Sequence, residues 1–149
     1  MPSHSTLLYQ TSIRVVAEFR AQHRWLNCPF EQVAFLRNWH RHVFKVALEL
    51  WVSHDDRDEE FFMVQSQLLE RLAKWEGAQL DMSCEMMAMQ LTTAFLDRGH
   101  LVKSVTVSED GENSATIQTL NVRRPAAQEM LIAADDVFSF ASPSGATSV

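Results

Sequence analysis

Two histidines lie two positions apart at the start of a segment that has the pattern of a buried strand. His40 and His42 are followed by apolar residues at every second position, namely Phe44, Val46, Leu48, Leu50 and Val52. Successive side chains of a strand point to opposite faces, so both imidazoles share the apolar face. The sequence therefore predicts two histidines at one end of a core-facing strand surface.

A third histidine falls into the same arrangement. Residues 12–22 alternate between apolar and polar side chains, with Ile13, Val15, Ala17, Phe19 and Ala21 on the apolar side. One further step of this alternation reaches His23, at the end of the strand. If the two strands pair antiparallel, the end of the first meets the start of the second. His23 should then lie beside His40 and His42.

Three imidazoles with one open coordination position are typical of a catalytic zinc site. Zinc in such a site acidifies a bound water or substrate hydroxyl and polarises a carbonyl, which suits enolisation, hydration or elimination. The alternative is that His23, His40 and His42 are hydrogen-bonded histidines at the edge of the core. Their spacing favours the metal, because two of them share a face and the third is in phase on the neighbouring strand.

Glu109 is a candidate ligand-binding residue. It follows Val105 and Val107 on the same strand face and precedes the turn-forming pair Asp110-Gly111. A carboxylate there could accept two hydrogen bonds from an amidine-like edge, such as N2–H and N3–H of a pterin or guanine. A solvated acid in a hairpin turn is the other interpretation.

Two further groups could take part in proton transfer. Cys28 precedes a possible short helix, where a thiol pKa can be lowered, although a buried inert thiol is the more ordinary explanation. His54, Asp55 and Asp56 form an acid-base cluster after the second strand, with a solvated turn as the alternative.

The remaining patterns complete an α+β fold. A brief helix or structured flap is expected within residues 24–39, and apolar residues at three- and four-residue steps predict helices over 61–75 and 83–98. Residues 101–108 and 114–122 alternate like strands. The order ββααββ indicates an antiparallel sheet with both helices on one face.

Length and charge narrow the class of protein. A chain of 149 residues suits one domain, here an N-terminal extension over 1–11, a domain over 12–122 and a tail over 123–149 whose end should be disordered. The net charge of -6 argues against a nucleic-acid surface. No membrane-spanning segment or signal peptide is recognisable, so we expect a cytoplasmic protein with two free thiols.

Several motifs resemble one enzyme family in the same order. FRAQHR (residues 19–24) and HRHVFKV (residues 40–46) resemble the two metal motifs of the 6-pyruvoyl-tetrahydropterin synthase and 6-carboxy-tetrahydropterin synthase family, the second being HGHNYxV. The short segments EF (60–61), SCE (83–85) and VSE (107–109) are similar to its DF, its TSE and its glutamate-bearing strand end. The resemblance covers residues 12–122.

The resemblance implies a tunnelling fold (T-fold), with His23, His40 and His42 binding zinc and Glu109 anchoring a pterin or purine-like base. It also implies a homo-oligomer, commonly a hexamer, with active sites between subunits. The family acts on dihydroneopterin triphosphate and leads to biopterin or to 7-deazaguanines.

The sequence departs from the family at three places. No cysteine lies a few residues before His40, no DHHxLN segment lies between the helices, and Arg41 replaces the glycine of HGH. The prediction is a divergent zinc-dependent lyase in which Cys28, His54 or Asp55 replaces the missing proton carrier. The alternative is a non-catalytic oligomer that binds or sequesters a pterin, purine or nucleotide.

Overall fold

The computed structural model describes residues 4–120 and 127–133. The described residues form two compact units, one over residues 11–120 and a smaller one that combines residues 4–10 with residues 127–133. In the smaller unit, β1 (His4–Tyr9) pairs antiparallel with β7 (Gln128–Ala133). The disorder expected at the end of the chain falls outside the described residues.

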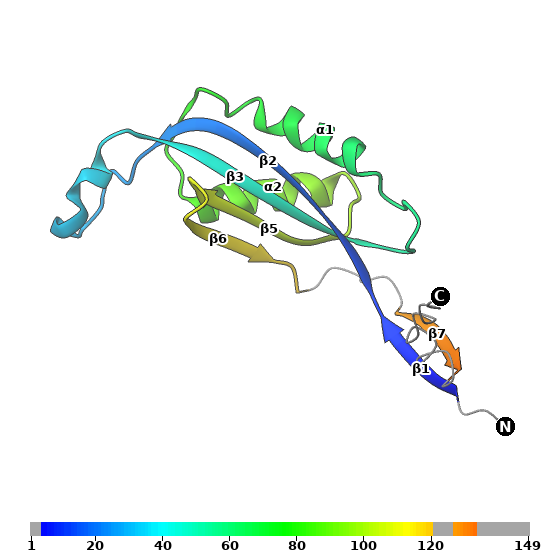
Figure 1. Ribbon diagram of the computed structural model, residues 1–149. Coiled ribbons are helices and arrows are strands. Elements are labelled where there is room, and N and C mark those ends of the chain that lie inside the picture. The colour runs from blue at the N-terminus through cyan, green and yellow to red at the C-terminus, as the bar shows by residue number, and fades with distance from the viewer. Residues whose placement is uncertain (1–3, 121–126, 134–149) are drawn as a thin grey trace, which may run out of the picture. The chain divides into compact units, whose positions relative to one another are not determined.

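The larger unit contains a five-stranded sheet in the order β4-β2-β3-β5-β6. Figure 1 labels four of these strands, β2, β3, β5 and β6. β2 (Thr11–His23), β3 (His40–Val52), β5 (Val102–Glu109) and β6 (Asn113–Gln118) pair antiparallel, as the sequence predicts. The two-residue strand β4 (Gln79–Leu80) is an addition that the sequence analysis did not anticipate. It pairs parallel with the end of β2, so the sheet is mixed.

Three helical segments accompany the sheet. The 3-10 helix η1 (Glu31–Arg37) occupies the connection between β2 and β3, where a short helix or flap was expected. The α-helices α1 (Phe61–Leu72) and α2 (Cys84–Asp97) are capped at their N-termini by Glu60 and Ser83, whose side chains accept backbone N–H bonds from Met63 and Met86. These caps satisfy amides that a helix start would otherwise leave unpaired.

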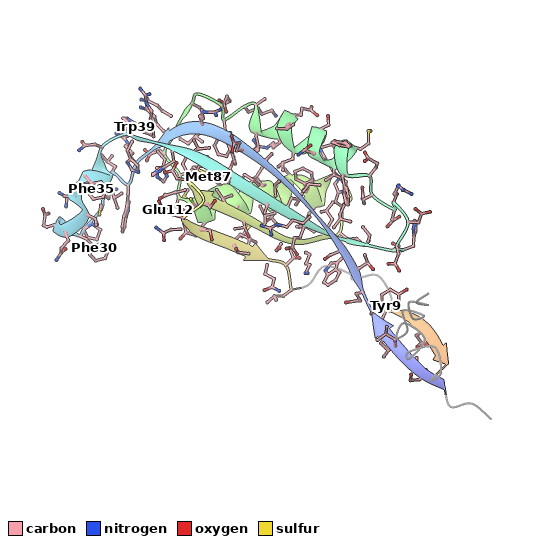
Figure 2. The ribbon with its side chains drawn as sticks, in the orientation of Figure 1. Tyr9, Phe30, Phe35, Trp39, Met87 and Glu112 are labelled. Atoms are coloured by element: carbon pink, nitrogen blue, oxygen red, sulfur yellow. The ribbon has the colours of Figure 1, made fainter. Side chains whose placement is uncertain are left out.

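Both α-helices pack against one face of the sheet, and the core lies between them and the apolar faces of β2, β3 and β5. Phe44, Val46, Leu48, Leu50 and Val52 are all buried, so the face predicted for β3 is confirmed. Figure 2 labels Met87, a fully buried residue of α2. Because this core fixes which face of each strand points inward, it also fixes where the histidines point.

Within the described residues, no helix has both the length and the apolar character needed to cross a membrane.

Candidate metal and ligand site

Strand pairing brings the three histidines together. His23 is directly opposite His40 in the β2–β3 register, and His42 is opposite Ala21. The ring centroid of His23 lies 4.5 Å from that of His40 and 5.1 Å from that of His42, and the last two rings are 5.0 Å apart. All three rings meet edge to face, so their nitrogens can converge. Trp39 and the β5–β6 turn around Glu112 mark this end of the sheet in Figure 2.

Backbone carbonyls fix the tautomer of two of these rings. His23 Nδ1 lies 3.1 Å from the carbonyl oxygen of Met82, and His40 Nδ1 lies 2.8 Å from that of Asn38. A carbonyl oxygen only accepts hydrogen bonds, so each Nδ1 must carry the proton. The neutral ring then keeps its free lone pair on Nε2.

A carboxylate fixes the third ring in the same way. His42 Nδ1 lies 2.6 Å from Asp110 Oδ2, while Asp110 Oδ1 accepts the backbone N–H of Val43 at 2.9 Å. Both contacts lower the pKa of Asp110, the bond from His42 contributing most. A histidine held by a carboxylate through Nδ1 is the usual supporting arrangement of a protein metal ligand.

The three Nε2 atoms therefore form the natural ligand set. One ligand nitrogen from each histidine lies within 4.8 Å of the other two. Nε2 of His40 is buried without a hydrogen-bond partner, which is rare and costly for a polar atom. Such an orphaned lone pair, aimed at two other imidazoles, fits a divalent metal ion with nitrogen ligands such as zinc.

Glu109 lies against the same group. Its Oε1 is 3.1 Å from His23 Nε2, and its Oε2 is 3.7 Å from His42 Nε2. When Nδ1 of His23 carries the ring proton, both atoms of the shorter contact are acceptors. Two acceptors at this distance need a proton or a cation between them. The structure thus brings together all four residues predicted as metal ligands or base anchor.

Burial lowers the pKa of His23, although the Met82 carbonyl and the Glu109 charge act in the opposite direction. A lowered pKa keeps the imidazole neutral over a wider pH range. Since only the neutral form can bind a metal ion, the environment of His23 favours ligation.

A cavity of about 720 Å³ opens beside these residues. Its apolar lining includes Trp25, Leu36 and Met86, and its polar lining includes the two cavity-facing histidines, His23 and His40. A volume of several hundred Å³ with apolar walls and a few polar groups is typical of a small-molecule site.

Cys84 stands next to Glu109 in this cavity, although the sequence analysis did not select it. Its Sγ donates toward Glu109 Oε1 at 3.8 Å. Burial, followed by the charge of Glu109, raises the pKa of the Cys84 thiol to about 12. This thiol is therefore neutral near pH 7 and is a hydrogen-bond donor rather than a nucleophile.

Cys28 is not brought to the cluster. It is 2 % exposed, and its Sγ faces the carbonyl oxygens of Phe30 and Val33 at 3.8 and 4.0 Å. It does not line the cavity beside His23. This environment favours the alternative interpretation of Cys28 as a buried thiol.

His54 and Asp55 lie beyond the opposite end of β3, because twelve residues separate His42 from His54 along an extended strand, roughly 40 Å. His54 pairs with Asp58 at 3.4 Å, and Asp55 accepts a hydrogen bond from the Thr11 hydroxyl. Within one subunit, this cluster has the contacts of a solvated turn.

The sequence alone predicts only that Asp110 lies in a turn. Its backbone φ of 54° is uncommon for a residue with a side chain, though aspartate tolerates it in turns. That conformation directs the carboxylate to His42. The Asp-Gly pair predicts the turn from the sequence. Which residue the Asp110 side chain contacts depends on the pairing of β3 with β5.

No family model and no curated protein matches the sequence. Solved structures do match in fold. Caenorhabditis elegans 6-pyruvoyl tetrahydropterin synthase has a TM-score of 0.64 at 14% identity, over 76% of this chain and 98% of that chain. An uncharacterized protein from Wolinella succinogenes has a TM-score of 0.55 at 15% identity, over 76% of this chain and 99% of that chain. A catalytic-residue mutant of Plasmodium vivax 6-pyruvoyltetrahydropterin synthase has a TM-score of 0.50 at 14% identity, over 78% of this chain and 98% of that chain. The chain therefore has the α+β tunnelling fold that the sequence predicts.

The raised pKa of Cys84 gives a prediction about its reactivity. At pH 8, a pKa of about 12 leaves roughly one thiol in 10⁴ ionised, against about one in ten for a thiol with the ordinary value of 9.0. Alkylation by iodoacetamide, followed by mass spectrometry, should therefore be slow at Cys84 in the folded protein and fast after denaturation. Rapid modification of folded protein at pH 8 would contradict this environment.

Proposed function

We propose that the chain is a divergent zinc-dependent enzyme of the 6-pyruvoyl- or 6-carboxytetrahydropterin synthase type. It acts on dihydroneopterin triphosphate or a related pterin, in tetrahydropterin or 7-deazaguanine biosynthesis in the cytoplasm. The observation that carries the proposal is the convergence of three Nδ1-protonated histidines and Glu109 at the edge of one cavity.

His23, His40 and His42 would hold zinc through Nε2, with their Nδ1–H groups tied to the acceptors described above. When bound, zinc supplies Lewis-acid chemistry that acidifies a substrate hydroxyl or polarises a carbonyl. The role of the protein is to keep the three rings in one orientation and to leave a coordination position accessible from the cavity.

Glu109 would orient the ring of the ligand. Its two carboxylate oxygens can accept the N2–H and N3–H bonds of a pterin, and the cavity supplies apolar surface for the ring. The neutral Cys84 thiol donates toward Oε1, which limits the rotation of the carboxylate. Glu109 is thus a binding residue, and Cys84 positions it.

Proton transfer by His54 or Asp55 would require a second subunit, since neither residue reaches the histidines of its own chain. We propose that the chain assembles as a homo-oligomer, with a hexamer expected from the family resemblance. Such a ring could bring the His54–Asp55 turn of one subunit to the histidines of a neighbour. Cys28 would need to turn away from its present carbonyl contacts to take part.

A binding protein for a pterin, purine or nucleotide is the second candidate. It is favoured by the state of the two thiols: Cys84 is protonated because its pKa is about 12, and Cys28 does not line the cavity. A site that binds the ring without a nearby thiolate or acid-base pair could retain its ligand unchanged.

Zinc content tests the metal site directly. Wild-type protein refolded with zinc and dialysed should retain one equivalent per subunit, while the double variant His40→Ala/His42→Ala should retain almost none, because a single remaining imidazole binds weakly. Inductively coupled plasma mass spectrometry gives the stoichiometry.

His54→Ala is the matched control, since it removes a histidine that lies outside the cluster, and it should retain zinc at the wild-type level. Stoichiometric zinc in the double variant would overturn the assignment of His40 and His42.

Glu109→Gln tests the orientation of the ligand. Replacement of one carboxylate oxygen by an amide N–H places a donor against a ring donor, and loss of a charge-assisted hydrogen bond should weaken pterin binding roughly 10- to 100-fold. Titration of zinc-loaded protein with dihydroneopterin measures the affinity, and Glu112→Gln, in the same turn, is the control that should bind normally.

The same samples, incubated with dihydroneopterin and with its triphosphate, separate the two candidate functions. Elimination or side-chain cleavage products detected by liquid chromatography–mass spectrometry support the enzyme. Tight binding with recovery of unchanged ligand supports the binding protein, and unaltered affinity in Glu109→Gln would contradict the role of Glu109 in either.

A further inference from the structure

We propose that Arg24 is a positioning residue that orients His23 and His40 together. It does so through one contact to each of the two segments that supply the hydrogen-bond acceptors of these rings. The inference rests on the proposed function, in which the histidines hold zinc, and it adds a residue that acts on the site without binding the metal.

The pairing of β2 with β3 ends at these two histidines. His23 and His40 form the last pair of the register. The end of a strand ladder opens more easily than its middle, because backbone pairing holds it from one side only. The acceptors of the two rings, the carbonyl oxygens of Met82 and Asn38, both lie outside the strands. Contacts other than strand pairing must therefore hold these acceptors in place.

Arg24 holds the Met82 segment through Asp81. Its Nη2 and Nε atoms lie 3.2 and 3.4 Å from Asp81 Oδ2. The backbone pairing of this segment with β2 ends at Leu80. The ion pair extends the attachment by one residue, to the position directly before Met82. It therefore helps to keep the Met82 carbonyl oxygen at 3.1 Å from His23 Nδ1.

The same guanidinium holds the start of β3 through Trp39. The central carbon of the Arg24 guanidinium lies 4.4 Å from the centroid of the Trp39 ring, within the range of a cation–π contact. Trp39 lies between His40 and Asn38, whose carbonyl oxygen is 2.8 Å from His40 Nδ1. Fixing the Trp39 side chain therefore fixes the backbone that carries both the ring and its acceptor.

An arginine is suited to making both contacts at once. A guanidinium is planar, so its edge donates hydrogen bonds to a carboxylate while its face stacks on an aromatic ring. The side chains of Arg24 and Asp81 are 27% and 55% exposed, and such exposed ion pairs add little to the stability of a domain. The effect of Arg24 is therefore local, on the alignment of two acceptors with two rings.

Three single variants separate the two contacts. Asp81→Ala should release the ring of His23 and leave that of His40 in place. Trp39→Ala should release the ring of His40 and leave that of His23 in place. Arg24→Ala should release both rings, because it removes both contacts.

The Nδ1–H protons of the rings report this release. They are followed by isotope-edited NMR of the full-length protein labelled at histidine, with and without zinc. A hydrogen-bonded N–H exchanges slowly with water, whereas a released ring loses this protection. His42 is the internal control: it bonds to Asp110, so its proton should stay protected in all three variants.

Zinc affinity is the second readout. Competition with a chromogenic chelator should show a loss of about tenfold for Asp81→Ala and Trp39→Ala, and of up to roughly 100-fold for Arg24→Ala. Asp81→Asn keeps an acceptor oxygen and Trp39→Phe keeps an aromatic face, so both should recover most of the affinity. The matched control Arg20→Ala removes an arginine of β2 that pairs with Glu18, and it should bind zinc at the wild-type level.

Unchanged protection of the His23 and His40 protons in Arg24→Ala would overturn this inference. Loss of protection at His42 as well, together with a lower melting temperature, would also overturn it, because that pattern indicates a general structural role. A wild-type protein that binds no zinc but shows the expected pattern of protection would overturn the proposed function and leave the positioning role of Arg24 intact.

Discussion

The antiparallel register of β2 and β3 is the constraint on which the site depends. It sets His23 opposite His40 and leaves His42 on the same face, one pleat further along. A slip of one residue would turn the histidines of one strand to the other face of the sheet. The stacked rings of Phe19 and Phe44, with centroids 5.1 Å apart, pack below the imidazoles and help to hold this register. The core thus positions the three histidines as well as stabilising the domain.

Hydrogen bonds at Nδ1 set the orientation of the three histidine rings. Each Nδ1–H is directed at an acceptor from a different segment: the connection before β3, the loop before α2, or the β5–β6 turn. The three Nε2 lone pairs consequently face one another and Glu109, an arrangement that needs a cation or protons to be stable. The carboxylates that line the neighbouring cavity, among them Glu109, also favour a cation at this place.

Much of this architecture could be predicted from the sequence, because periodicity of two residues reports directly on strand faces. The alternation that ends at His23 and begins at His40 was sufficient to predict their convergence, and the parity of Glu109 placed it on the same side. The partners of these residues were not predictable in the same way. Asp110, Cys84 and the Arg24–Asp81 pair depend on which segments meet across the chain, and local pattern does not encode that pairing. The two-residue strand β4 is too short for periodicity to reveal.

The central claim is that His23, His40 and His42 bind one zinc ion through nitrogen. X-ray absorption at the zinc K-edge of the loaded protein tests it most directly. The predicted result is a first shell dominated by three imidazole nitrogens at about 2.0–2.1 Å, with the remaining position filled by oxygen. A shell containing sulfur at about 2.3 Å, or oxygen without the multiple-scattering signature of imidazole, would contradict the account.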